Sequence, residues 1–380
     1  MADDDAMLRP FVKSGDVPGL VALVARGDDV SVTTLGVQGT SGAPMRRDSI
    51  FRGASITKPL TAALTMMLVD DGRLDLDAPV AELLPELAAP RVLREQDSEL
   101  DDTVEAERPI TTRHLLTGTA GHGFATWESP VVALLMEHLG QASEDIHAVP
   151  EPDEWMRRLG QIPLMHQPGA GWTYNASYDV LAVLLARAAG QGFADLMADR
   201  LLEPLGMVDS GFHVPADRLD RFTTLFERDD DGVLQVGDEV DGVFTSEPPF
   251  ASGSGGLVTT ADDWFAFGRM LLAEGEGPDG RLLAADSVRL MTTDQLTAQH
   301  REMGGFFLDG QGWGFGGGVD TELIDRWNVV GRYGWVGGTG TSAYVYPDSG
   351  LVAVLLTQVG LADPAVALLE TFWTVCADLV

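Results

Sequence analysis

The sequence predicts a mixed α/β (α+β) fold in which helices flank an antiparallel sheet and a helical region is inserted. Apolar runs of strand length at residues 20–25 and 30–35 stand on either side of a Gly-Asp-Asp turn, which predicts a hairpin. Two further runs of this kind, at 342–346 and 351–357, lie near the other end of the chain. Between them, residues 111–205 carry apolar residues mostly at helical spacing. Strands at both ends with helices between them indicate a discontinuous α/β domain.

The remaining expected elements follow from the same patterns. Residues 1–85 and 245–380 form the expected α/β domain, and residues 86–244 form the mainly helical inserted domain. The acidic residues 94–108 and 229–242 are expected to be solvated or turn-rich loops. Apolar spacing predicts a short strand at 329–330 and helices at 80–87, 131–139, 155–159, 179–189, 195–205, 261–274 and 364–379.

The net charge of the chain limits the classes of partner that it can bind. The sequence holds 25 Lys and Arg against 58 Asp and Glu, a net charge of −33. We expect no nucleic-acid or membrane partner, because both associations depend on cationic surfaces, and a neutral or cationic small molecule instead. Such an acidic surface suits high salt, where self-repulsion is screened. A codon bias favouring Asp, Ala, Gly and Arg is the alternative, and composition does not separate the two or give the oligomeric state.

Several absences indicate a cytoplasmic protein without a metal or cofactor. Residues 1–5 are acidic and precede no apolar leader, and no apolar run reaches membrane-spanning length. One cysteine, Cys376, leaves no intrachain disulfide and fits a reducing compartment. The seven histidines contain no His-Glu-x-x-His pair, and a single cysteine cannot build a thiolate cage for zinc.

Residues 53–59 (GASITKP) carry a candidate nucleophile together with its base. A serine hydroxyl is a weak nucleophile unless a proton acceptor lies within hydrogen-bond reach. Lys58 follows Ser55 by three residues, and in a helix beginning near Ser55 these two side chains share one face. Apolar residues at helical spacing over 60–68 support such a helix. On this motif alone, the alternative is that Ser55 caps the helix and Lys58 extends along its surface.

Two later stretches fit the same chemistry. Residues 168–177 place Tyr174 in a loop just before a helix, where its phenol can reach a cleft. Residues 335–341 (WVGGTGT) enter a strand, and their glycines allow a substrate to lie close to free backbone N–H groups. The sequence Gly-x-Ser-x-Gly does not occur, which excludes the nucleophile elbow of α/β-hydrolases.

In this order, the motifs resemble the serine hydrolases of the β-lactamase and penicillin-binding-protein superfamily, in the branch of class C β-lactamases, D-specific peptidases and family VIII carboxylesterases. The resemblance covers nearly the whole chain and implies a β-lactamase/transpeptidase-like fold. It implies that Ser55 attacks a carbonyl and that Lys58 and Tyr174 share the proton transfers, without indicating which is the base. It also implies an oxyanion hole formed by the amides of Ser55 and Gly338. Further landmarks are Val17-Pro18-Gly19, 72–80, 110–117, Pro168-Gly169, 203–207 and Gly255-Gly256-Leu257.

The chain departs from the β-lactamase pattern at positions expected to bind substrate. The second motif of the family, Tyr-x-Asn, has Ala176 at its third position, with Asn175 shifted by one. The third motif, Lys-Thr-Gly, is replaced by Trp335-Val336-Gly337. We therefore expect Asn175, Gly337 and Trp335 to bind substrate, the indole packing against an apolar part of a neutral ester. The alternative is that Trp335 packs only against protein.

The predicted function is a carboxylesterase that cleaves small neutral esters through an acyl-Ser55 intermediate. Loss of the cation of the third motif, together with the acidic protein, disfavours β-lactams and peptides that carry a carboxylate. A β-lactamase or D-amino-acid peptidase is the first alternative. The second alternative is a catalytically inactive binding protein of the same fold, since a fold does not by itself imply activity.

Overall fold

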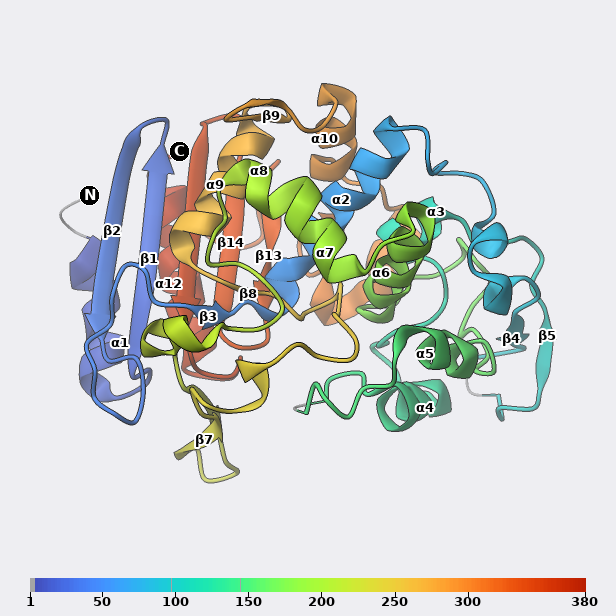
Figure 1. Cartoon of the computed structure of the whole chain (residues 1–380), viewed down its shortest axis with the longest axis horizontal. Helices are drawn as coiled ribbons and strands as arrows, with labels where there is room; N and C mark the ends of the chain where they lie inside the picture. The colour runs from blue at the N-terminus through green and yellow to red at the C-terminus, as the bar shows by residue number, and fades with distance from the viewer. Residues whose placement is uncertain (1–3, 97, 144) are drawn as a thin grey trace.

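The structure, a computed structural model, describes residues 4–96, 98–143 and 145–380; Asp97, one of the acids of the 94–108 stretch, lies outside them. Seven strands of this part form one antiparallel sheet in the order β11-β12-β13-β14-β15-β1-β2 (Figure 1). They are β1 (Gly19–Arg26), β2 (Asp29–Gly36), β11 (Gln311–Trp313), β12 (Gly318–Asp320), β13 (Tyr333–Gly337), β14 (Thr341–Tyr346) and β15 (Leu351–Thr357). The expected hairpin β1–β2 is present, and β1 joins it to the C-terminal strands by pairing with β15.

Both faces of the central strands are buried, which explains their unbroken apolar sequences. Side chains alternate along β15: Val352 and Val354 belong to the core shared with α9, whereas Leu351 and Ala353 belong to the core shared with α1 and α12. The flanking helices are α1 (Asp4–Ser14), α9 (Ala261–Leu272) and α12 (Ala365–Ala377). The sheet is therefore the middle layer of three.

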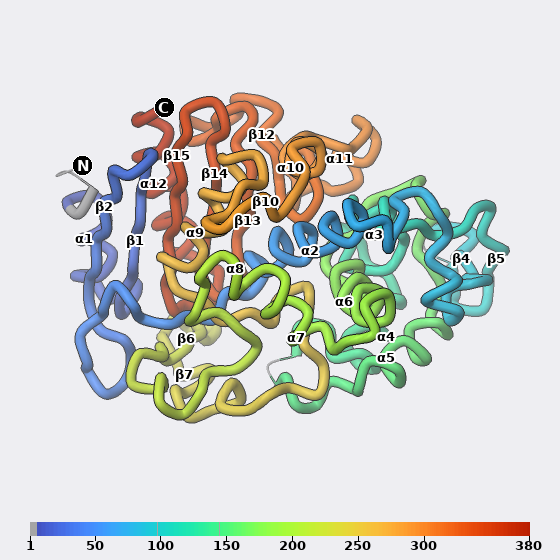
Figure 2. Tube along the Cα trace, turned by 45° about the horizontal axis from the view of Figure 1, so that its top comes forward, coloured from blue at the N-terminus to red at the C-terminus, as the bar shows by residue number. Residues whose placement is uncertain are grey.

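Helix α2 (Lys58–Asp70) lies between the sheet and the helices that gather on the side away from β2 (Figures 1 and 2). Residues 58–68 of α2 are all buried, and the polar ones, Lys58, Thr61 and Thr65, form hydrogen bonds within the protein. The other helices are α3 (Thr112–Leu116), α4 (Pro130–Leu139), α5 (Pro152–Leu159), α6 (Ala176–Ala189), α7 (Phe193–Met197), α8 (Glu203–Leu205), α10 (Ala285–Thr292) and α11 (Ala298–Gly304). None in the described ranges is, as one helix, long and apolar enough to cross a membrane. The expected domain boundaries, at 85/86 and 244/245, stay a prediction.

Four local expectations differ from the structure. The helix expected at 80–87 is two 3₁₀ turns, because Pro85 lacks the N–H that a continuous helix requires. Residues 329–330 lie in the connection between β12 and β13 and not in a strand, and Val330 is 54% exposed. The acidic stretches 94–108 and 229–242, which were expected to be loops, each contain one strand of a short hairpin. The short strands are β3 (Phe51–Arg52), β4 (Arg91–Leu93), β5 (Thr103–Glu105), β6 (Leu225–Arg228), β7 (Leu234–Asp238), β8 (Val258–Thr259), β9 (Glu276–Gly277) and β10 (Gly280–Arg281).

Candidate active site

Ser55 lies where the short strand β3 turns into α2. Ala54 adopts a left-handed backbone with φ of 47°, a conformation that L residues rarely take, and a 3₁₀ turn over Ala54–Thr57 leads into the helix. In this turn Lys58 Nζ donates a hydrogen bond of 2.8 Å to Ser55 Oγ. The spacing of three residues therefore brings the two groups together as expected, through a 3₁₀ turn that adjoins the α-helix.

Lys58 is fully buried, and its amine is surrounded by acceptors. Besides Ser55, Nζ donates to Asn175 Oδ1 and to the carbonyl oxygen of Ser254, each at 2.7 Å. Burial lowers the pKa of Lys58 to about 7, and the carboxylate of Asp179 opposes this shift. At neutral pH a large fraction of Lys58 is therefore a free amine, which can accept a proton.

Tyr174 reaches the same place from the loop that precedes α6. Its backbone pairs with Phe124, which fixes the loop, and its ring centroid lies 4.5 Å from Lys58 Nζ. Burial raises the pKa of Tyr174 to about 12, although hydrogen bonds with Ser55 and Trp335 oppose the shift. The phenol therefore keeps its proton at neutral pH and is available as a hydrogen-bond donor.

The end of β13 lies directly against the segment before Ser55. A Cβ on Gly337 would approach the Gly53 carbonyl oxygen to 2.4 Å, so only glycine fits at this contact. Thr341 and Thr339 fasten the same junction, because their hydroxyls donate to the carbonyl oxygens of Gly53 (2.7 Å) and Arg52 (2.6 Å). In the described part of the chain, the backbone N–H of Gly338 has no acceptor, and a Cβ there would meet open space.

A cavity of about 560 Å³ opens in front of these groups. Four of the predicted site residues line it: Ser55, Tyr174, Asn175 and Gly338. The remaining wall includes the apolar side chains of Phe124, Leu139, Ile146, Val149, Trp155, Leu225, Phe244 and Phe250, and also the carboxylates of Asp179, Glu227 and Asp238. The one arginine among the lining residues forms an ion pair with Asp238 and a cation–π contact with Phe222. The cavity therefore suits a ligand that is largely apolar and uncharged.

Trp335 and Gly337 do not line this cavity. Trp335 is only 4% exposed; its indole packs edge-on against Trp313 with ring centroids 4.6 Å apart, and Nε1 donates a 2.6 Å hydrogen bond to the Tyr174 hydroxyl. This position favours the alternative in which the indole contacts protein. Its partner is nevertheless a predicted catalytic side chain, so Trp335 belongs to the site through Tyr174.

Sequence reasoning missed three residues around Lys58. Gln141 hydrogen-bonds both Asn175 and Asp179, and Ser254 supplies a carbonyl acceptor to Lys58. Asp179 offered a signal, because a carboxylate within the apolar run of α6 is expected to be buried with partners. Gln141 and Ser254 offered none, since their contacts join segments far apart in the chain.

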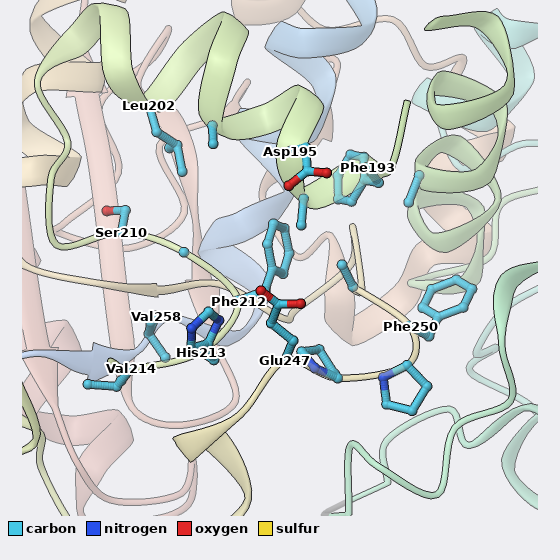
Figure 3. Close-up of a pocket in the computed structure, with 18 of the residues that line it drawn as sticks. Phe193, Asp195, Leu202, Ser210, Phe212, His213, Val214, Glu247, Phe250 and Val258 are labelled. Carbon is cyan, nitrogen blue, oxygen red and sulfur yellow. The ribbon is translucent and has the colours of Figure 1, made fainter. Parts of the chain in front are cut away.

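A second cavity, of about 440 Å³, adjoins the first, because Pro248 and Phe250 line both. Figure 3 shows its aromatic wall, to which Phe193 and Phe212 contribute, and the carboxylates of Asp195 and Glu247. Among the described residues that line it there is no lysine or tyrosine, and the hydroxyl of its serine, Ser210, donates to Asp263. The reactive groups therefore gather at the first cavity.

Comparison with known proteins identifies the family of the chain. The sequence model of the Beta-lactamase family matches residues 5–370. The chain belongs to the β-lactamase family. This membership and the antiparallel sheet confirm the expected fold class, and they identify the chain as a serine hydrolase.

Relatives in the β-lactamase family include esterases. The chain is 34% identical over 367 positions to Rv1367c of Mycobacterium tuberculosis, covering 93% of this chain and 89% of that protein. It is 31% identical over 382 positions to esterase EstB of Burkholderia gladioli, covering 95% and 91%. The solved structure of EstCE1, a hydrolase with promiscuous acyltransferase activity, matches with a TM-score of 0.80 at 24% identity, covering 98% of this chain and 97% of that one. Together with the family match, these relatives support a serine hydrolase, and the EstCE1 match shows the shared fold.

Proposed function

We propose that the protein is a carboxylesterase that cleaves neutral esters through an acyl-Ser55 intermediate. The observation that carries the proposal is the contact between Lys58 Nζ and Ser55 Oγ at the wall of an apolar cavity. A serine within 2.8 Å of an amine whose pKa is about 7 has its general base in place. The relationship to esterase EstB supports an ester substrate.

The reaction balances with the groups at hand. Ser55 Oγ bonds to the carbonyl carbon while its proton passes to Lys58 Nζ, and the carbonyl π electrons move to the oxygen facing the amides of Ser55 and Gly338. Collapse of this intermediate breaks the bond to the alcohol oxygen, which takes a proton from the Lys58 ammonium. Water then attacks the acyl group, gives its proton to Lys58, and Ser55 Oγ leaves with that proton. Ester and water become acid and alcohol.

The two pKa values support Lys58 as the base, a choice that the sequence left open. Lys58, with a pKa of about 7, is partly deprotonated at neutral pH, whereas Tyr174, with a pKa of about 12, is protonated. Because Trp335 donates to the phenol oxygen of Tyr174, the phenol O–H is free to point toward Ser55 or the leaving oxygen. Lys58 is then the base, and Tyr174 donates a hydrogen bond.

The cavity extends the expected substrate class beyond small esters. A volume of about 560 Å³ falls in the range of about 300–1,000 Å³ that holds drug-sized ligands. Its aromatic and aliphatic wall favours a bulky apolar acyl or alcohol group. A carboxylate would find no unpaired cation among the described lining residues, which disfavours β-lactams and peptides with a free C-terminus.

Labelling and kinetics test the proposal. A fluorophosphonate probe should attach to Ser55, and Ser55→Ala should abolish both labelling and hydrolysis of p-nitrophenyl butyrate. Ser287→Ala is the control, because the Ser287 hydroxyl also forms a hydrogen bond within the protein, to Asp70 on α2, but does not line the cavity. In a panel of p-nitrophenyl esters and nitrocefin, kcat/KM should peak at a bulky acyl group and be lowest for nitrocefin. Labelling at another serine, or a Ser55→Ala protein with full activity, would refute the proposal.

A further inference from the structure

The direction of the Lys58 lone pair is set by two acceptors. A free amine has two N–H bonds and one lone pair, and Lys58 Nζ has three partners. Two of them, Asn175 Oδ1 and the carbonyl oxygen of Ser254, can only accept. When both N–H bonds are directed to these oxygens, the lone pair must point at the third partner, Ser55 Oγ. Whatever fixes these two oxygens therefore aims the base.

The first acceptor, Asn175 Oδ1, is fixed by a chain of amides. An amide side chain presents either oxygen or NH₂ in nearly the same shape, so its partners decide which way it faces. Asn175 Nδ2 donates to Gln141 Oε1 at 2.9 Å, and Gln141 Nε2 donates to Asp179 Oδ2 at 2.6 Å. A carboxylate only accepts. Asp179 therefore turns the NH₂ of Gln141 toward itself, which turns the NH₂ of Asn175 toward Gln141 and its oxygen toward Lys58.

The second acceptor leads to the same carboxylate. Asp179 Oδ1 accepts from the backbone N–H of Ser254 at 3.1 Å and from the hydroxyl of Ser252 at 2.7 Å. Oδ2 also accepts from the Ser254 hydroxyl at 3.0 Å. These bonds hold the residue whose carbonyl faces Lys58. Asp179 itself is 2% exposed and forms no ion pair with a described arginine or lysine.

We propose that Asp179 is a positioning residue of the esterase reaction, which orients the free amine of Lys58 toward Ser55 through Gln141 and Asn175 on one side and through Ser254 on the other. The inference rests on the proposed function, in which Lys58 is the base. Asp179 does not touch the reacting atoms; it acts through the groups that do. Its charge has a second effect, because it stabilises the ammonium form of Lys58 and opposes the effect of burial.

Three ionisable groups surround Lys58 Nζ: Asp179, Tyr174 with its ring centroid at 4.5 Å, and Tyr178 at 6.0 Å. Burial raises the pKa of both phenols, so they stay protonated at neutral pH, and the electrostatic effect that raises the pKa of Lys58 comes from Asp179. For the wild type, kcat/KM for p-nitrophenyl butyrate should rise tenfold per pH unit below about 7 and level off above it. Removal of the Asp179 charge should shift this rise to lower pH.

Two variants separate the charge of Asp179 from its orienting role. Asp179→Asn keeps the shape, removes the charge and allows the amides to reverse; we expect kcat to fall about 100-fold, KM to change less than threefold, and the acid limb to shift down by about one pH unit. Gln141→Met breaks the amide chain and keeps the charge; we expect kcat to fall about tenfold with the acid limb unmoved. The double variant should lose less than the product of the two factors.

Asp263→Asn is the matched control. Asp263 is also a buried carboxylate, 6% exposed, that accepts hydrogen bonds from a serine hydroxyl and a backbone N–H, and it lies on α9. Wild-type kcat in Asp179→Asn, or an equal fall with no pH shift in Asp179→Asn and Asp263→Asn, would overturn the inference. If Asp179→Asn does not fold, Gln141→Met decides, and full activity there would overturn it. Fluorophosphonate labelling of wild-type Ser55 shows separately whether the proposed function itself stands.

Discussion

Replacing Trp335 with phenylalanine asks whether the indole serves Tyr174 or the substrate. In the structure, Trp335 Nε1 donates a 2.6 Å hydrogen bond to the Tyr174 hydroxyl, and the ring is 4% exposed. Phenylalanine keeps an aromatic ring against Trp313 and removes the N–H. This hydrogen bond also lowers the pKa of Tyr174, because it stabilises the phenolate. Without it, the pKa of Tyr174 should rise further above its ordinary value.

The expected effect is on kcat. Leaving a buried polar group without its partner costs about 1–3 kcal/mol, which corresponds to a fall of about 5- to 150-fold in rate at about 1.4 kcal/mol per factor of ten. KM should stay within about twofold across p-nitrophenyl acetate, butyrate and octanoate, because the indole does not line the cavity. The ratio of activities on the three esters should be unchanged.

Trp373→Phe is the control for this experiment. Trp373 Nε1 also donates a buried hydrogen bond, to Ser342 Oγ at 2.7 Å, but it belongs to the core on the opposite face of the sheet. It should lower the melting temperature as much as Trp335→Phe does and leave kcat unchanged. The reasoning fails if Trp335→Phe keeps the wild-type kcat while KM rises with acyl chain length, since that result would place the indole against the substrate.

Two further predictions concern the backbone beside Ser55 and the surface charge. Gly337→Ala should lower kcat and the rate of fluorophosphonate labelling about 100-fold, because its Cβ would lie 2.4 Å from the Gly53 carbonyl oxygen. Gly192→Ala, whose Cβ would make only an ordinary contact of 3.6 Å with Asp195, should stay close to wild type; equal rates would refute the contact. If the charge of −33 is an adaptation to salt, the melting temperature should rise between 0.1 and 1 M potassium chloride, as the Debye length falls from about 10 Å to about 3 Å, and a flat or falling value would favour codon bias.

The elements that could be predicted from the sequence are those with strong periodicity. Strands β14 and β15 and helix α9 are long and uniformly patterned, and the structure has them within a few residues. Strands β11 and β12 were not predicted, because each has only three residues and contains a glycine, as in the segment QGW of β11. The hairpins β4–β5 and β6–β7 lie beside acidic stretches whose charge indicates loops.

The candidate site also has a part that could be predicted from the sequence and a part that could not. The pair Ser55 and Lys58 is local in the chain, so spacing alone brings it together. Asn175 takes a backbone with φ of 85°, which no sequence pattern announced, and this turns its side chain toward Lys58. Gln141 and Asp179 meet only because α6 packs beside the end of α4, a contact that depends on the whole helical region. Residue propensities do not predict such long-range contacts.

The strand order has a consequence for how the protein acquires its activity. Because β1 lies between β2 and β15, Leu20 near the start of the chain must pair with Thr357 near its end before the sheet is complete. Contacts between such distant residues carry a large loop-closure entropy and slow folding. The end of β13, which borders the segment before Ser55, leaves the ribosome long after Ser55 and Lys58 do. A growing chain therefore carries Ser55 and Lys58 without the strand that completes their surroundings, so hydrolysis should begin only after β13 has been made and has joined the sheet.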